Sequence, residues 1–181
     1  IKADVQDVDR DRTRQPDQTR GEYKPPDGVG PLLVSHANYL RERGFDPAVI
    51  RKIWGVRGLG ATSRLSWRLF LPVAFEGQPV SWTTRSIIPG DTGRYRSASP
   101  AEEALDHKKL LYGQDFARQA IVVVEGPTDA WAGGPGTVAT FGTAFSRAQL
   151  LRIAGYPRRT VIFDNEPEAQ RRARGLCDDL S

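Results

Sequence analysis

Two stretches of the chain, residues 119–134 and 158–170, constrain the fold more than any others. In the first, an apolar run ends on Glu125 and is followed at once by a glycine and a proline. In the second, an apolar run ends on Asp164, and Glu166 lies two residues later. Short β-branched runs bounded by turn residues are typical of buried strands. Helical patterns flank both runs, which favours parallel strands in an α/β sheet.

The position of these acids predicts a metal site. In an open α/β sheet, ligands bind beyond the carboxyl ends of the strands, which is where Glu125 and Asp164 would lie. Two or three carboxylates gathered there repel one another unless a cation lies between them, and hard oxygen ligands suit Mg²⁺ or Mn²⁺. The alternative for each acid is a helix-cap or turn carboxylate at a strand-to-helix junction.

The composition of the chain limits its class. A length of 181 residues allows one domain of good size or two small ones. A hydrophobic content of 39% and a charged content of 27% indicate a mostly globular protein. The single cysteine, Cys177, excludes an intramolecular disulfide and a cysteine-based zinc site within this chain, which is typical of a cytoplasmic protein. No apolar run has the length of a membrane span, and the first residues form no signal-peptide pattern, so we expect no membrane partner.

The net charge of +4 is unevenly distributed along the chain. Residues 31–120 carry 13 basic and 8 acidic side chains, whereas residues 121–181 carry 7 of each. No acid occurs between Asp46 and Glu76. A basic face beside an acidic metal site suits an enzyme that handles polyphosphates or nucleic acid. The alternative is an ordinary solvated surface that is rich in arginine.

The first third of the chain predicts an arm and a helical hairpin. Residues 1–30 are polar and rich in proline and glycine, so we expect a linker with little structure. A first helix is expected from Ser35. A second has Asp46 as its cap, Pro47 at its first position and Gly55 past its end.

The rest of the chain predicts a β-hairpin and then a regular βαβα series. The expected strands are residues 69–75, 80–87, 120–125, 137–141 and 160–164. The expected helices are residues 128–133, 146–154 and 167–180, with a loop at 91–100 and a short helix within 101–113. The last helix has one apolar face, formed by Ala169, Ala173, Leu176 and Leu180.

The motifs EGPTDA and FDNE together resemble the Toprim fold, in which a strand-end glutamate and a later Asp-x-Asp pair bind divalent metal. Glu125 matches the glutamate and Asp164 the first aspartate. Asp129 matches an acid often found four residues after the glutamate. Glu166 stands where the second aspartate is expected. A glutamate keeps the negative charge, but its side chain is one methylene group longer.

The segments upstream narrow the resemblance to the catalytic core of DnaG-type primases, especially phage versions. YLRERGFDPAVIRKIWG, WRLFLPV, EGQPVSWTTR, RYRSAS and HKKLLYG occur in the order of that family, and the likeness covers roughly residues 32–181. It implies a polar arm at 1–30, a small basic nucleic-acid-binding subdomain at 31–118 and a partial Toprim domain at 119–181. The implied fold class is α/β, or α+β overall: a mixed α/β subdomain followed by a parallel Toprim sheet.

This resemblance implies a DNA primase, a nucleotidyltransferase that joins NTPs into a short RNA on a single-stranded DNA template with Mg²⁺ or Mn²⁺. Glu125, Asp164 and Glu166 are the expected catalytic acids and metal ligands, with Glu125 as ligand or general base, and Asp129 is a further ligand or orients one. The expected nucleotide or nucleic-acid contacts are Arg68, Arg85, Arg94, Arg96, Lys108 and Lys109, the two lysines being alternatives for one family position. A solvated surface charge is the alternative for each.

Departures from the family pattern leave other functions open. The chain has no cysteine set for the family's zinc module, and it stops soon after the third Toprim strand, so we expect an incomplete metal site. A Toprim nuclease and a non-catalytic module for single-stranded nucleic acid are the alternatives, while a topoisomerase would need a much larger DNA gate. A replicative helicase or a fused polymerase or helicase domain is a further expected partner.

The aromatic residues and histidines are expected to be mainly structural. Trp54, Trp67, Trp82 and Trp131 are predicted to pack mostly in the core, with base stacking as the alternative. His107 lies beside the two lysines and is expected to be a surface or hydrogen-bonded residue.

Overall fold

The computed structural model of the chain describes residues 21–181, so most of the predicted arm lies outside the described residues. The strands are β1 (Val29–Gly30), β2 (Arg57–Leu59), β3 (Arg68–Phe75), β4 (Gln78–Ser86), β5 (Tyr95–Ser97), β6 (Ala120–Val124), β7 (Thr137–Ala139) and β8 (Arg158–Val161). The helices are α1 (Val34–Glu42), α2 (Pro47–Trp54), α3 (Pro127–Gly133), α4 (Arg147–Ala154) and α5 (Pro167–Asp179), and the 3₁₀ turns are η1 (Pro100–Glu102), η2 (His107–Lys109) and η3 (Gln114–Phe116).

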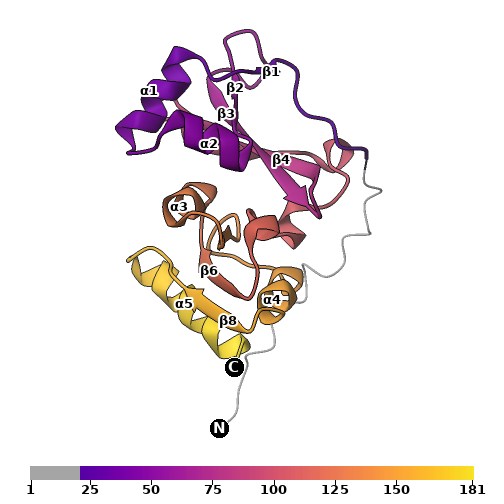
Figure 1. The fold of residues 1–181 in the computed structure, drawn as a ribbon, viewed down its shortest axis with the longest axis vertical. Helices are drawn as coiled ribbons and strands as arrows, with labels where there is room; N and C mark the ends of the chain where they lie inside the picture. The colour runs from indigo at the N-terminus through magenta and orange to yellow at the C-terminus, as the bar shows by residue number, and fades with distance from the viewer. Residues whose placement is uncertain (1–20) are drawn as a thin grey trace.

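These strands form two sheets. An antiparallel sheet of five strands has the order β1-β2-β3-β4-β5, and a parallel sheet of three strands has the order β7-β6-β8. Figure 1 shows the antiparallel sheet with α1 and α2 in the upper part of the view, the parallel sheet with α4 and α5 in the lower part, and α3 between them. This is the mixed α/β fold that the sequence predicted.

The centre of the antiparallel sheet is the hairpin of β3 and β4, as predicted. Its register ends at the pair Phe75 and Gln78, so the loop has two residues, Glu76 and Gly77. Both have positive φ angles, 54° and 77°, which is the backbone form of a tight turn that matches the twist of the strands. The carboxylate of Asp115 accepts hydrogen bonds from both turn amides, at 3.1 and 2.9 Å, and so ties the hairpin to η3.

The helical hairpin before it is confirmed, with one correction. In α2, the Asp46 carboxylate accepts the Ala48 N–H at 2.8 Å and Gly55 follows with φ 65°, as the sequence predicted. The first helix starts at Val34 with Leu33 at its N-cap, so Ser35 is not the cap. The ring Nδ1 of the buried His36 accepts the Leu33 N–H instead, at 3.1 Å.

Three short strands were missed because they are defined by pairing rather than by their own pattern. β5 lies in the segment predicted to be a loop, and it pairs with β4 from Thr83 to Arg85. β1 and β2 add the other edge of the sheet. Residues 21–28 form no helix or strand, in line with the little structure predicted for residues 1–30, but residues 29–30 form β1, and the Lys24 carbonyl accepts the Trp82 Nε1–H at 2.8 Å.

The parallel sheet follows the predicted βαβα series closely. β6, β7, β8 and their helices lie within a few residues of the expected ranges. β8 ends at Val161, however, so Asp164 lies in the loop before α5 rather than on the strand. In α5, Ala169 and Leu176 are buried, with Ala173 and Leu180 packed against the same cluster, which confirms the predicted apolar face.

One hydrophobic core joins the two sheets. Its members include Leu71 of β3, Val124 of β6 and Trp131 of α3. Trp54 stacks on Tyr112 with ring centroids 5.4 Å apart, and Trp131 Nε1 donates to the Tyr112 hydroxyl at 2.9 Å. Trp54, Trp82 and Trp131 are therefore core residues as predicted, whereas Trp67 is 37% exposed. The part of the chain that the structure describes contains no helix long and apolar enough to cross a membrane.

Candidate functional site

A cavity of about 370 Å³ lies between the carboxyl end of the parallel sheet and strands β4 and β5. Its acidic wall is formed by Glu125, Asp129 and Asp164. Its basic side chains are Arg43, Arg85, Arg94 and Lys108, and His107 and Phe141 also line it. The cavity thus brings together three of the four predicted acids and three of the six predicted cations.

The acids are positioned by the loops that follow β6 and β8. The Glu125 carboxylate accepts the Asp164 backbone N–H at 2.8 Å, which holds these two loops together. The Asp129 carboxylate accepts the Gly126 N–H at 3.0 Å at the start of α3. Asp129 therefore has a capping role as well as a place at the cavity. Glu166 precedes α5 as its N-cap residue and does not line the cavity.

The charge of the acidic wall is only partly compensated. Burial raises the pKa of Glu125, the Asp164 amide partly offsets that, and repulsion from Asp164, Asp129 and Glu166 raises the pKa further. Burial also raises the pKa of Asp129 and Asp164 adds repulsion, whereas the hydrogen bond from Gly126 and the charges of Arg85 and Arg43 act to lower it. This donor set fits a divalent cation, because carboxylate oxygens are hard ligands and a cation would relieve their mutual repulsion.

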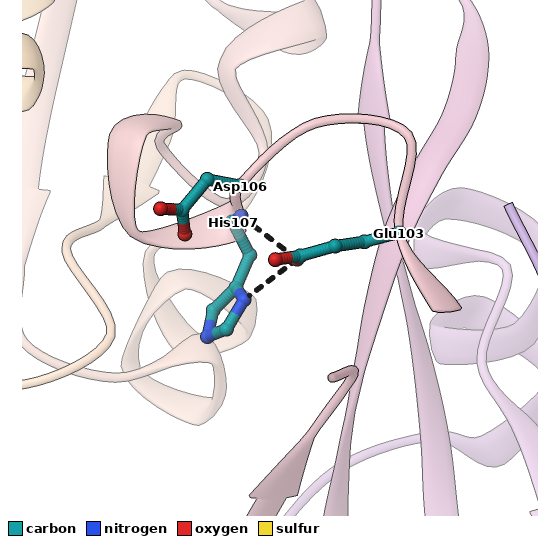
Figure 2. A group of neighbouring side chains, drawn as sticks. All are labelled: Glu103, Asp106 and His107. Carbon is teal, nitrogen blue, oxygen red and sulfur yellow. Dashed lines mark hydrogen bonds and ion pairs between the residues drawn. The ribbon is translucent and has the colours of Figure 1, made fainter. Parts of the chain in front are cut away.

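The four predicted acids do not form the tightest group of ligand atoms. Among the described residues, the group with ligand atoms within 4.8 Å of one another is Glu103, Asp106 and His107. Figure 2 shows the Glu103 carboxylate facing the backbone and ring of His107. Its Oε2 accepts the Ser81 hydroxyl at 2.7 Å and the His107 N–H at 3.1 Å, and lies 3.0 Å from His107 Nδ1. This group was not predicted from the sequence, although a glutamate four residues before a histidine can indicate a contact between the two side chains.

Arg85 is the best-ordered cation of the cavity. It is only 6% exposed, and its Nε and Nη1 donate to the hydroxyls of Tyr39 and Tyr95, both at 2.6 Å. Burial alone would lower the pKa of Arg85, but the two tyrosines outweigh burial and raise it. Its guanidinium also lies over the Tyr95 ring, 5.1 Å from the centroid. The side chain is therefore held in place before any anion binds.

The other predicted cations divide into two groups. Arg94 and Lys108 are exposed at the cavity, so Lys108 rather than Lys109 is the lysine that lines it. Arg68 lies outside the cavity: it is 4% exposed and donates to the Asp91 carboxylate at 2.7 Å and the Gly93 carbonyl at 2.6 Å. Arg96 is exposed and does not line the cavity.

A second cavity, of about 730 Å³, adjoins the first along the loop between β4 and β5. The two cavities share Arg43, Arg85 and Arg94. Arg43 was missed by sequence reasoning, because it follows α1 and only its charge marks it. The three shared arginines form a basic track beside the acidic wall, although Glu42 and Asp91 also line the larger cavity.

Comparison with known proteins identifies the fold. No protein-family model and no curated protein matches the sequence. The E. coli primase catalytic core is similar with a TM-score of 0.64 and 18% identity, over 83% of this chain and 61% of that chain. A DnaG primase catalytic domain bound to single-stranded DNA gives 0.62 and 19%, over 83% and 60%. A chain from the bacteriophage T7 lagging-strand polymerase in complex with gp4 primase domains, an RNA/DNA hybrid and dTTP gives 0.53 and 14%, over 83% and 80%.

The chain thus has a mixed α/β fold in which an antiparallel sheet and a parallel sheet enclose a cavity with an acidic and a basic wall. Its structural neighbours are catalytic cores of DnaG-type primases, which is the fold that the sequence predicted. The chain spans about three fifths of the length of the first two of these structures.

Proposed function

We propose that this chain is the catalytic core of a DNA primase, which joins NTPs into a short RNA on a single-stranded DNA template. The observation that carries the proposal is the cavity in which Glu125 and Asp164 face Arg85, Arg94 and Lys108. Joining nucleotides requires carboxylates that hold divalent cations and cations that hold a triphosphate. A primase-core fold supplies the expected context for such a site.

The acidic wall would hold Mg²⁺ or Mn²⁺, with Glu125 and Asp164 as the main ligands and Asp129 and Glu166 as further ligands or orienting groups. A divalent cation bound there supplies a Lewis acid that lowers the pKa of an attacking hydroxyl and neutralises charge on the departing pyrophosphate. The capping bond of Asp129 to Gly126 keeps its carboxylate at the rim of the wall. Glu125 could instead accept the proton of the reacting hydroxyl as a general base.

The basic wall would bind the triphosphate. Arg85 presents N–H groups beyond the two that it donates to tyrosines, and its fixed position reduces the entropy lost on binding. Arg94 and Lys108 are exposed at the same cavity and add mobile charge-assisted donors. Arg68 holds the loop after β4 instead, so its contribution to binding would be indirect.

The larger cavity would accept the template strand. It continues the basic track away from the acidic wall through Arg43 and Arg94, and Arg96 lies exposed on the neighbouring β5. A similar DnaG primase catalytic domain was solved bound to single-stranded DNA, which supports this partner. A replicative helicase or a polymerase stays a further proposed partner, in a bacterial or phage-infected cell.

The test is incorporation of labelled NTPs on mixed single-stranded DNA templates in Mg²⁺ or Mn²⁺. We expect template-dependent di- or oligonucleotides from the parent and none from Asp164→Asn. Asp178→Asn is the matched control, because Asp178 is an exposed acid on α5 that does not line the cavity. Equal synthesis by the parent and by Asp164→Asn would contradict the assigned site.

A non-catalytic module that binds single-stranded nucleic acid is the second candidate. Among the described residues, no three of the four acids have ligand atoms within 4.8 Å of one another, and Glu166 lies outside the cavity; both observations favour it. It predicts DNA binding that persists in EDTA and in Glu125→Gln and Asp164→Asn. Binding of that kind, without synthesis by this chain or by a longer form of the protein, would replace the primase proposal.

A further inference from the structure

His107 is a nearly enclosed side chain at the cavity for which the proposed function has given no task. It is 6% exposed and lines the same cavity as Glu125, Asp164 and Lys108. Its backbone N–H and its ring Nδ1 both face the Glu103 Oε2 atom, at 3.1 and 3.0 Å (Figure 2). The Phe141 ring packs edge-on against the imidazole, with centroids 5.3 Å apart. The orientation of the imidazole is therefore fixed from two sides.

The Glu103 contact also fixes where the ring carries its proton. Burial alone would raise the pKa of Glu103, but hydrogen bonds from His107 and Ser81 outweigh it and hold the pKa below its ordinary value. Glu103 is thus ionised at neutral pH and can only accept. Nδ1 must then be the protonated nitrogen, and in the neutral ring Nε2 is left as a hydrogen-bond acceptor.

Nε2 has no hydrogen-bond partner among the described residues and is not fully enclosed. The hydrogen bonds of the His107 ring and backbone N–H are those to Glu103. Among the described residues, the fully buried side-chain nitrogen and oxygen atoms that lack a hydrogen bond are His36 Nε2 and Gln114 Nε2. His107 Nε2 also lacks a hydrogen bond but is not among them, so it is not fully buried. Nε2 therefore keeps an accessible surface, and the space that His107 lines is the cavity.

The other side chains that line the cavity indicate what Nε2 would bind. Arg43, Arg85, Arg94 and Lys108 only donate and suit phosphate oxygens, and the three acids suit cations. An oriented acceptor nitrogen suits the hydroxyl of a sugar instead. The cavity of about 370 Å³ is within the usual range of small-ligand sites.

We propose that His107 Nε2 accepts a hydrogen bond from a ribose hydroxyl of the nucleotide in the cavity, with Glu103 and Phe141 as positioning residues. This inference rests on the proposed function, since it takes the ligand to be a nucleoside triphosphate. If the hydroxyl is the 2′-OH, His107 makes the site prefer ribonucleotides over deoxyribonucleotides, because a site built to bind a hydroxyl discriminates against the analogue that lacks it.

The test is binding of ATP, 2′-dATP and 3′-dATP in Mg²⁺ by isothermal titration calorimetry, which does not require synthesis. We expect the parent to bind one of the deoxy analogues about tenfold more weakly than ATP, the value of one hydrogen bond. His107→Phe keeps an aromatic ring against Phe141 but removes Nε2, and it should bind ATP and that analogue alike. The competition of NTP with dNTP in synthesis should change in parallel.

A second variant acts through Glu103 and does not depend on how well His107→Phe folds. In Glu103→Ala, no carboxylate is left to accept the Nδ1–H, so the ring loses the contact that fixes its proton on Nδ1 and its orientation. We expect the same loss of discrimination, whereas Glu102→Gln, on the neighbouring glutamate that pairs with Arg64, should keep it. Equal weakening of all three nucleotides in both variants, or an unchanged ratio, would overturn the proposal. If the parent discriminates between the nucleotides in binding but synthesises no primer, the role proposed for His107 stands and the proposed primase activity is contradicted.

Discussion

The buried charged side chains of the antiparallel region and the acids at the carboxyl end of the parallel sheet differ in how their charge is compensated. In the antiparallel region, from β1 to η2, charges are paired within the protein: Arg68 with Asp91, Arg85 with two tyrosines, and Glu103 with Ser81 and His107. In the parallel region, Glu125 and Asp129 face other acids, and both have raised pKa values. The first group is paired within the protein, whereas the acids of the second repel one another and would be stabilised by a bound cation under the proposed function.

This difference shows how the site divides its work. Under the proposed function, paired groups such as Arg85 would fix the position of a phosphate or a sugar, because their side chains are held before a ligand binds. The acids that repel one another would bind a divalent cation more tightly, because the cation relieves that repulsion. Substitutions in the two regions should therefore have opposite effects on stability, and four comparisons test this.

The largest effect is expected for Glu125→Gln. Loss of this carboxylate should lower primer synthesis by at least about 100-fold, the typical result of removing one charge-stabilising group from an active site. In metal-free buffer the same change should raise Tm, because it removes repulsion while the amide oxygen can still accept the Asp164 N–H. Thermal unfolding with and without Mg²⁺ measures this. Glu168→Gln, on an exposed glutamate of α5, is the control, and a lower Tm for Glu125→Gln in EDTA would break the comparison.

The two arginines Arg68 and Arg94 give the next test. Arg68→Ala should lower Tm by about 5 °C, because it leaves the Asp91 carboxylate and the Gly93 carbonyl without their donor. Arg94→Ala should leave Tm nearly unchanged but weaken binding of single-stranded DNA several-fold and reduce its salt dependence. Fluorescence anisotropy at several salt concentrations measures the binding. The reverse assignment of the two effects would show that Arg68 is the ligand-binding residue.

The pH dependence of stability should differ in sign between Glu125 and Glu103. The pKa of Glu125 is raised in the folded state, so its contribution is present below the ordinary value of 4.5 and is lost as pH rises through the folded pKa. The pKa of Glu103 is lowered, so its contribution is present above 4.5 and is lost as pH falls through the folded pKa.

Metal-free urea unfolding of the parent, Glu125→Gln and Glu103→Gln between about pH 4 and about pH 8 should show this. Relative to the parent, Glu125→Gln should become more stable as pH rises, and Glu103→Gln should become less stable. Parallel pH profiles for the two variants would mean that both carboxylates are compensated equally.

The smallest effect concerns the hydrogen bond between Trp131 and Tyr112 in the core that joins the two sheets. Tyr112→Phe leaves the Trp131 Nε1–H without its acceptor, and we expect a loss of about 1–2 kcal/mol in the free energy of unfolding. Tyr156→Phe, at a half-buried ring of the other core cluster, should change it by less than about 0.5 kcal/mol. Chemical denaturation measures the free energy of unfolding of both variants. Equal losses would show that the hydrogen bond from Trp131 to Tyr112 contributes little to stability.

The sequence predicted the elements that carry their own signals. α2 has its cap, its proline and its glycine in sequence order, and the series from β6 to α5 has a clear apolar period. β2 and β5 have three residues each and exist because β3 and β4 pair with them, which a local pattern does not report. The N-cap of the first helix was predicted at Ser35, two residues late, because serine is a usual cap, whereas the observed N-cap, Leu33, has no capping side chain and donates its N–H to His36.

Only part of the site was predicted, because some of its features depend on contacts between distant segments rather than on a local pattern. Glu125 and Asp164 follow strands, and topology alone brings them together. The arginines look alike in the sequence, and only the fold separates the buried Arg68 from Arg94 at the cavity. The role of Glu103 depends on a side-chain contact between a loop and η2, which no spacing rule establishes by itself.

The open side of β8 has a consequence for handling the protein in solution. Within the described residues, β8 pairs with β6 alone, and its exposed Arg158 and Arg159 lie along the outer edge of the sheet. Like charges on an edge strand oppose pairing with a second copy of the same strand. Salt shortens the range of that repulsion from about 10 Å at 0.1 M to about 3 Å at 1 M. Concentrated samples should therefore self-associate more as salt is added, while the proposed binding to DNA weakens.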